Sequence, residues 1–263
     1  MPALDYFPYL PPIGPFGSPE DYSGELGKSG YYTVETTKRF AIGQIAYALD
    51  GSRLRYAKSC GACLSGQGCE FTSLGFSAYT AAGVAASIGD TSITLPAATH
   101  SAVAANELQG GYVIIFNGTD NDTQKRMIMK HAASAANAAV LEVELDAALT
   151  EAIVAATSAM EVYKNPWDGL QLGASVSLAK AGVPLAPVSA TGYYFWLQES
   201  GPTWIAPQSG ITGKHRGACW RHDGSLDTVD NGVEDNANVT SQYAGYAIAG
   251  SADAIGPLFM LQG

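Results

Sequence analysis

The sequence has few charged residues, and few of these are basic. Only 14% of the 263 residues are charged, and 14 Lys and Arg stand against 24 Asp and Glu, so the formal net charge is −10. Proteins that bind the phosphate backbone of nucleic acids need a basic surface. We therefore expect no nucleic acid among the partners of this protein.

The sequence also lacks a long uninterrupted apolar run. The longest candidate, ASAANAAVLEVELDAALTEAIVAATSAM, is broken by four acidic residues, which excludes a membrane span and predicts no membrane partner. A secretory signal has a basic segment followed by an apolar segment, and the start of this chain has no such pair. We expect the protein to accumulate first in the cytoplasm of the cell that makes it.

Recognisable catalytic motifs are absent as well. The sequence contains no H-E-x-x-H, G-x-S-x-G, Walker loop or Rossmann fingerprint. The most suggestive stretch is GKHRGACWRHDG, with His215, Cys219, His222 and Asp223. In a strand, His215 and Cys219 would lie about 13 Å apart, too far for a Cys–His pair. We therefore expect a protein that is not an enzyme.

The sequence has only four cysteines, and three of them are close together. Cys60, Cys63 and Cys69 lie in CGACLSGQGC, where a zinc site would need Cys219 or His222 as its fourth ligand. A C-x-x-C redox pair is a second interpretation. The third, small semi-buried residues in a Gly-rich loop, fits the small neighbours best. We expect no metal and no cofactor, and these three cysteines are the only metal candidates.

Acidic residues gather in two stretches. Asp120 and Asp122 in GTDNDT have the spacing of a calcium loop, but the remaining ligands of that motif are missing, so a polar turn is favoured. The stretch HDGSLDTVDNGVEDNANVT holds five acidic residues and neither Lys nor Arg. It predicts a solvated loop, with a weak cation site or a basic partner as the alternative.

Short strands separated by turn residues are the main structural signal. FAIGQIAYAL, Asp50–Gly51 and SRLRYAKS predict a hairpin, because Asp-Gly tolerates positive φ. GYVIIF and TQKRMIMKH flank a polar turn, and AVLEVEL alternates apolar and acidic residues. EAIVAATSAMEVYKNP is interpreted as strand, turn and strand, although its alanines allow a helix. YYFWLQESGPTWIAP is interpreted as two strands joined by a Gly-Pro turn.

These patterns predict an all-β fold, a sandwich or barrel of short antiparallel strands with an extended Pro-rich N-terminal arm. The arm spans residues 1–30, and the β-rich domain spans residues 31–263, with a subdivision possible near 165–190. The arm, MPALDYFPYLPPIGPFGSPEDY, is too rich in proline for a helix or a central strand. Its aromatic side chains are predicted to anchor it to a partner, and they are Tyr6, Phe7, Tyr9 and Phe16. The alternative is that the arm folds back over its own domain and covers an edge.

The order of these elements resembles a family of virion proteins. GQIAYALDGSRLRYAKSCGACLSGQGC is similar to the first strands of head-decoration, or cement, proteins of tailed phages. SIGDTSITL, ELQGGYVIIFNGTDNDTQKRMIMKH and VLEVELDAALTEAI continue the similarity in order, as do YKNPWDGLQL, VPLAPVSATGYYFWLQESGPT and the late GYAIAG and GPLFMLQ. The resemblance covers residues 40–263, and the arm lies outside it.

The resemblance implies a virion structural protein on the exterior of an icosahedral phage capsid, assembled in the host cytoplasm. Its partner would be the major capsid protein, bound across neighbouring subunits so that the capsid is stabilised. The resemblance also implies a homo-oligomer, with a trimer as the first expectation because capsids have threefold axes.

Two other classes remain open. The first is a tail or fibre component that binds host surface carbohydrate, because the YYFW stretch, Trp204 and Trp220 could stack on sugar rings, although such residues more often fill a β core. The second is an enzyme, such as a wall-degrading hydrolase, for which the sequence nominates no pair of carboxylates.

Overall fold

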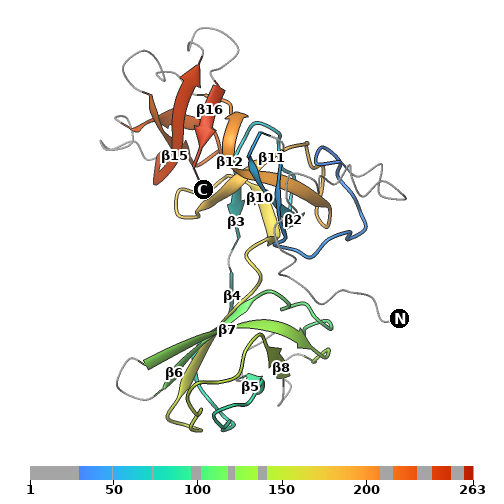
Figure 1. Ribbon diagram of the computed structural model, residues 1–263, viewed down its shortest axis with the longest axis vertical. Helices are drawn as coiled ribbons and strands as arrows, with labels where there is room; N and C mark the ends of the chain where they lie inside the picture. Colours follow the sequence, from blue (N-terminus) through green and yellow to red (C-terminus); the bar gives the residue numbers. More distant parts are fainter. Residues whose placement is uncertain are drawn as a thin grey trace. The chain divides into compact units, whose positions relative to one another are not determined.

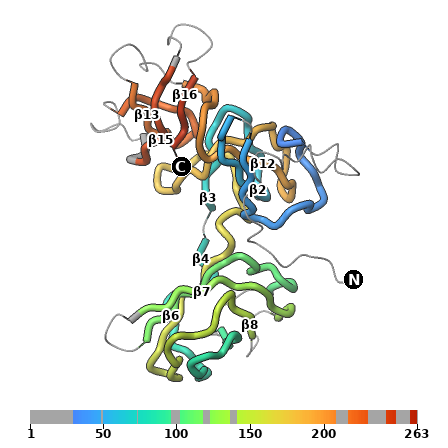
Figure 2. The backbone as a smooth tube through the Cα atoms, in the orientation of Figure 1, coloured from blue at the N-terminus to red at the C-terminus, as the bar shows by residue number. Residues whose placement is uncertain are grey.

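The computed structural model describes residues 30–48, 50–72, 74–95, 102–117, 122–135, 141–207, 216–229, 239–249 and 258–262. Its secondary structure consists of strands, which confirms the all-β prediction (Figure 1). The chain divides into two compact units. Unit 1 comprises residues 1–72 and 167–263, and unit 2 comprises residues 73–166. Figure 2 shows the corresponding colours, with green in unit 2 and both blue and red in unit 1. No helix in the described ranges is long and apolar enough to cross a membrane.

The first part of unit 1 is a closed barrel of five strands. Each strand pairs with the next, and the last pairs with the first. In order around the barrel they are β2 (Arg53–Ser59), β10 (Asp168–Leu172), β3 (Cys69–Phe71), β11 (Lys180–Pro184) and β12 (Tyr194–Trp204). Only the β2–β10 pair is parallel. The core contains Cys63, Cys69, Phe195 and Leu197, all almost fully buried.

The predicted hairpin at Asp50–Gly51 is confirmed. β1 (Ile45–Tyr47) pairs antiparallel with β2, Gly51 has a φ of 84°, and Asp50 Oδ1 accepts a 2.9 Å hydrogen bond from the backbone N–H of Ser52. An aromatic cluster packs against this hairpin, formed by Tyr31, Phe40, Tyr56, Tyr194 and Trp196. These rings attach the segment that follows residue 30 to the barrel.

The predicted Gly-Pro turn at Gly201–Pro202 is wrong, because both residues lie inside β12. The strand pairs with β2 as far as Ser200 and with β16 (Leu258–Leu261) from Gly201 to Trp204. Gly201 has a φ of 104°, and a Cβ there would lie 2.8 Å from the Cα of Ser52. The glycine therefore lets the strand pass β2 closely and continue into a second sheet.

This second sheet completes unit 1. Beyond β16 it contains three antiparallel strands, β15 (Val239–Ala249), β13 (Gly217–Arg221) and β14 (Leu226–Thr228). Its core is a cluster of buried side chains that includes Ile205, Trp220, Leu226, Phe259 and Leu261. A single strand, β12, thus contributes to both the barrel and the second sheet.

Unit 2 is a six-stranded antiparallel sheet. Its strands, in spatial order, are β4 (Gly75–Ala81), β9 (Ala159–Tyr163), β6 (Tyr112–Asn117), β7 (Asp122–His131), β8 (Leu141–Leu145) and β5 (Ser92–Leu95). β7 pairs with β6 as far as Met127 and with β8 from Ile128, so the sheet curls around its core. The core includes Leu108, Val113, Ile115, Ile128 and Met160.

Two predictions made for unit 2 have different outcomes. The alternation in AVLEVEL is confirmed, because Leu141, Val143 and Leu145 are buried and the two glutamates between them are exposed. The stretch 151–166 forms one strand, β9, and not two. Its first part forms no helix and contributes only an isolated bridge between Ile153 and Ala86.

Gly111 tests how closely the chain packs in unit 2. A Cβ at this position would overlap the carbonyl oxygen of Tyr163 and lie 2.9 Å from that of Leu108. We expect Gly111→Ala to destabilise the protein by about 1–3 kcal/mol, because backbone atoms cannot move away as a flexible side chain can. Gly83→Ala is the matched control in the same unit, since a Cβ there would contact nothing within 4 Å. Equal free energies of unfolding for the two variants would contradict the close approach.

Candidate interaction surface

The four aromatic residues predicted to bind a partner, Tyr6, Phe7, Tyr9 and Phe16, lie outside the described residues. The same holds for His215 and Asp120 among the residues weighed for catalysis or calcium. For these positions the predictions remain predictions. The described part of the chain contains other candidates that the sequence singled out, and further features that it did not.

The cysteine-bearing loop belongs to the barrel. Cys63 and Cys69 are buried in the barrel core, and Cys60 is half-buried beside β10, where its thiol donates to the carbonyl oxygen of Gly169 at 3.1 Å. Burial raises the pKa of the Cys60 and Cys69 thiols. Within the described ranges, no three His, Cys, Asp or Glu side chains are grouped so that they could hold a metal ion.

The glycines of this loop accommodate two tryptophan rings. A Cβ atom on Gly66 would overlap the ring of Trp204, and one on Gly68 would overlap the ring of Trp220. The Cβ on Gly66 would lie 2.7 Å from Cε3 of Trp204. The two residues have opposite environments, because Trp220 is buried in the core of the second sheet and Trp204 is 46% exposed. Trp204 therefore lies with one side against Gly66 and remains accessible from solvent.

The stretch 222–240 was predicted to be a solvated acidic loop, and for Asp227, which lies in β14, this is wrong. Asp227 is buried and accepts a 2.9 Å hydrogen bond from Nη1 of Arg221. Asp223 accepts hydrogen bonds from the backbone N–H and the hydroxyl of Ser225. Burial alone would raise the pKa of Asp223, but the Ser225 hydrogen bonds outweigh it and hold this pKa below its usual value. Cys219, next to Asp227, has its pKa raised to about 11 by burial.

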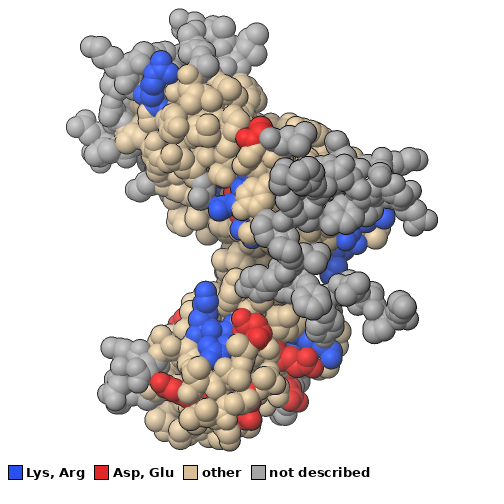
Figure 3. All heavy atoms as spheres, viewed as in Figure 1, with Lys and Arg blue, Asp and Glu red and all other residues tan. Residues whose placement is uncertain are grey.

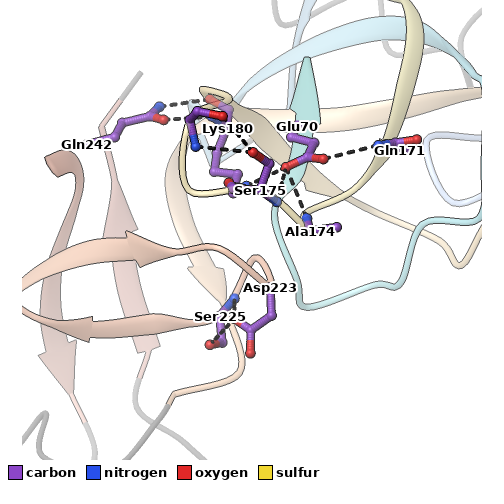
Figure 4. Close-up of polar contacts among 9 residues, drawn as sticks. Glu70, Gln171, Ala174, Ser175, Lys180, Asp223, Ser225 and Gln242 are labelled. Atoms are coloured by element: carbon purple, nitrogen blue, oxygen red, sulfur yellow. Dashed lines mark hydrogen bonds and ion pairs between the residues drawn. The ribbon is translucent and has the colours of Figure 1, made fainter. Parts of the chain in front are cut away.

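A buried ion pair lies on the outside of the barrel (Figure 4). Nζ of Lys180 on β11 is 2.7 Å from Oε2 of Glu70 on β3, and the side chains are 0% and 1% exposed. Glu70 also accepts hydrogen bonds from the backbone N–H groups of Ala174 and Ser175 and from Nε2 of Gln171. Each carboxylate oxygen thus has at least one donor, as a buried charge requires.

The same network connects the barrel to the second sheet. Oε1 of Gln242 on β15 accepts from the backbone N–H of Lys180 at 2.6 Å, and Nε2 of Gln242 donates to the carbonyl oxygen of Lys180 at 2.8 Å (Figure 4). Burial would raise the pKa of Glu70, but the donors around it, first among them Lys180, lower it. The ion pair fixes the position of Lys180 in the barrel, and the backbone of the same residue holds β15 of the second sheet through Gln242.

The outer side of the second sheet is an apolar surface. Side chains on alternate positions of its strands share one side. Pro202, Met260, Tyr246 and Gly217 are aligned across four strands by the pairing register. We call this surface the outer face and define it by Pro202, Trp204, Tyr243, Tyr246, Ile248, Leu258 and Met260.

On β15, the large side chains lie on the outer face and the small ones on the inner side. Tyr243, Tyr246 and Ile248 of β15 are exposed, whereas Ala244 and its small neighbours Gly245 and Ala247 are buried. Gly245 is required there, because its φ is 147° and a Cβ would overlap the carbonyl oxygen of Met260. The alternation in YAGYAIAG was visible in the sequence, but hydrophobicity alone suggests the opposite orientation. This explains why these residues were missed.

The seven residues of the outer face are uncharged, and the register places the Arg221–Asp227 pair on the same side of the sheet, next to Cys219. Figure 3 shows mostly uncharged side chains around β15 and β16, with a Lys or Arg group beside them. Exposed aromatic and aliphatic groups that adjoin one another mark protein interaction sites more often than isolated ones do. The geometry therefore supports binding of another polypeptide.

Comparisons with known proteins give no further assignment. No protein-family model, no curated protein and no solved structure matches this chain.

The Glu70–Lys180 pair leads to a stability prediction. Lys180→Met leaves the Glu70 carboxylate buried without its cation, so we expect a loss of about 3–5 kcal/mol. Lys58→Met is the control, because the Lys58–Asp168 pair of the same barrel is partly exposed and should contribute about 1 kcal/mol or less. Denaturant titrations measure both, and a loss no larger for Lys180→Met than for Lys58→Met would contradict the role of the pair.

The lowered pKa of Glu70 also predicts a dependence of stability on pH. A carboxyl whose pKa is lower in the folded state stabilises the protein above its unfolded value, about 4.3, and this contribution is lost as the pH falls through the folded value. Between pH 6 and 3, we expect the free energy of unfolding to fall more steeply for the wild type than for Glu70→Gln. Parallel curves for the two proteins would show that Glu70 does not titrate in this way.

Proposed function

We propose that this protein is a structural protein of a tailed-phage virion, which decorates the icosahedral capsid and stabilises it without catalysing a reaction. In this role it binds across neighbouring major capsid subunits from the capsid exterior. It acts as a homo-oligomer, for which a trimer matches the symmetry axes of a capsid. The many copies make the combined attachment strong even where each contact is modest.

The observation that carries the proposal is the outer face of the second sheet. Its exposed Trp204, Tyr243 and Tyr246 are the residue types that dominate binding energy at protein interfaces. The surface is held on a sheet whose strand β12 is shared with the barrel, so it is preorganised and loses little conformational entropy on binding. The order of sequence motifs that resembles the head-decoration family supplies the identity of the partner, the major capsid protein.

A tail or fibre component that binds host surface carbohydrate is the second candidate. Trp204, which lies against Gly66 and is partly exposed, favours it because an exposed aromatic ring can stack on a sugar. Phe195, Trp196 and Trp220, which the sequence also offered, are buried and cannot take part. The surroundings of Trp204 on the outer face are apolar and offer few polar groups for sugar hydroxyls, so the protein partner is favoured.

The number of copies per particle separates these functions. We expect quantitative mass spectrometry of purified particles to find on the order of hundreds of copies, in a simple ratio to the main shell subunit. The shell subunit in the same sample is the internal control for this ratio. A handful of copies would assign the protein to the tail or fibres, and its absence from the particle would contradict both functions.

A further inference from the structure

The outer face has the chemistry of a surface that binds proline-rich segments. Such surfaces present neighbouring Trp and Tyr rings, on which the flat sides of proline rings pack. Trp204 and Tyr246 lie on strands that are both paired with β16, and Leu258 and Met260 of β16 lie between them. These residues form a continuous apolar strip across three strands of one sheet.

The chain itself contains a segment that fits this strip. FPYLPPIGP, residues 7–15, has four prolines and no charged residue. Proline-rich segments favour the extended polyproline II conformation before they bind, so they lose little entropy on docking. An uncharged apolar segment also matches the uncharged strip of Trp204, Tyr246, Leu258 and Met260, because burying these side chains displaces no strongly bound water.

The point at which the arm joins the barrel places this segment within reach of the face on the same chain. Tyr31 packs edge-on against Trp196 of β12, with 6.0 Å between ring centroids, and its hydroxyl donates to the carbonyl oxygen of Tyr47. Trp196 and Trp204 belong to the same strand. At about 3.3 Å per residue they are about 26 Å apart along it.

Residues 16–29 connect the proline segment to this attachment point. A linker of this length extends to at most about 50 Å and has a root-mean-square span of about 20 Å. Intramolecular binding is most effective when the span of the linker matches the distance between the sites. The match favours the face of the same chain over that of a second copy.

We propose that Pro8–Pro15 of the arm docks on the outer face of its own chain in the free protein. The docked segment shields Trp204, Tyr243 and Tyr246 from unspecific contacts in solution. This proposal concerns the protein without any particle, so it does not rest on the proposed function. It is also compatible with that function, because the arm can transfer to a neighbouring subunit and release the face for binding.

A photocrosslinking experiment on the full-length chain tests the proposal. Tyr9→p-benzoylphenylalanine places a photoreactive group inside the docking segment, and mass spectrometry then maps the crosslinked peptides. We expect crosslinks within one chain to residues 239–249, 258–262 or the Trp204 region. Tyr32→p-benzoylphenylalanine is the control, because Tyr32 is exposed and lies outside the outer face, and it should give no crosslink to these peptides.

Mixing ¹⁴N- and ¹⁵N-labelled protein before irradiation distinguishes the two sources of the arm. Crosslinks of mixed label on the outer face would overturn the proposal in favour of the arm of a second copy. Crosslinks only to other parts of the molecule, or none, would overturn it as well.

Variants of the face and of the arm provide a second readout. Tyr246→Ser should lower the yield of the Tyr9 crosslink about tenfold, as expected for the loss of one aromatic anchor. Tyr79→Ser, which changes an exposed tyrosine of unit 2, should leave the yield unchanged. Replacing Pro8, Pro11 and Pro12 together by Ala should also lower it. Equal yields in all these proteins would contradict docking through the prolines.

Discussion

The structure of unit 1 depends on the sharing of one strand between two sheets. β12 pairs with β2 as far as Ser200 and then with β16, so the hydrogen bonds of eleven consecutive residues fix the barrel and the second sheet to each other. Nε2 of Gln198 donates to Oγ of Ser52 and to the carbonyl oxygens of Ser200 and Pro202, where the strand changes partners. Glu199, at the register shift, receives hydrogen bonds from Arg53 and Arg55. The side chains of Gln198 and Glu199 thus supply hydrogen bonds where the irregularity interrupts the strand pairing.

The Glu70–Lys180 pair also lies where the barrel meets the second sheet, but it acts through side chains and not through strand pairing. Two charges are costly to bury, and well-packed apolar side chains often stabilise a core as much. The pair instead specifies geometry: hydrogen bonds to Glu70 fix one position for the segment around Ala174. The backbone of Lys180, bonded to Gln242, fixes one position for β15. Together with β12, this network gives the outer face a defined shape, which matters for a surface that binds by shape and apolar contact.

Much of the fold followed from local patterns in the sequence. The Asp50–Gly51 hairpin and the alternation in β8 were predictable, because turn chemistry and a half-buried strand both leave signals within a few residues. β3, β10 and β11 left none, since they are three to five residues long and Gly169 and Gly182 interrupt the pattern with positive φ. The Gly-Pro pair in β12 was misread because a strand that changes partners and a turn need the same residue types.

The interaction surface was harder to predict than the fold. Glu70, Lys180 and Gln242 meet although more than 100 residues separate the first from the others, and nothing local marks them as partners. On β15 the large residues face outward because the inner side has room only for Ala and Gly. The sequence could predict that the strand had two unlike sides, but only the packing of β16 against Gly245 determined which side was exposed.

The division of the chain has a consequence for folding during synthesis. All strands of unit 2 are contiguous in sequence, and its ends meet, because the backbone N–H of Lys164 donates to the carbonyl oxygen of Leu74. β2 and β3, by contrast, leave the ribosome before residues 73–166 and wait for β10 to β12. At typical rates of about 5–20 residues per second, this delay lasts about 5–20 s. Unit 2 can fold in that interval, while Leu54, Tyr56 and Cys69 remain without their barrel partners and are open to chaperones or to premature association.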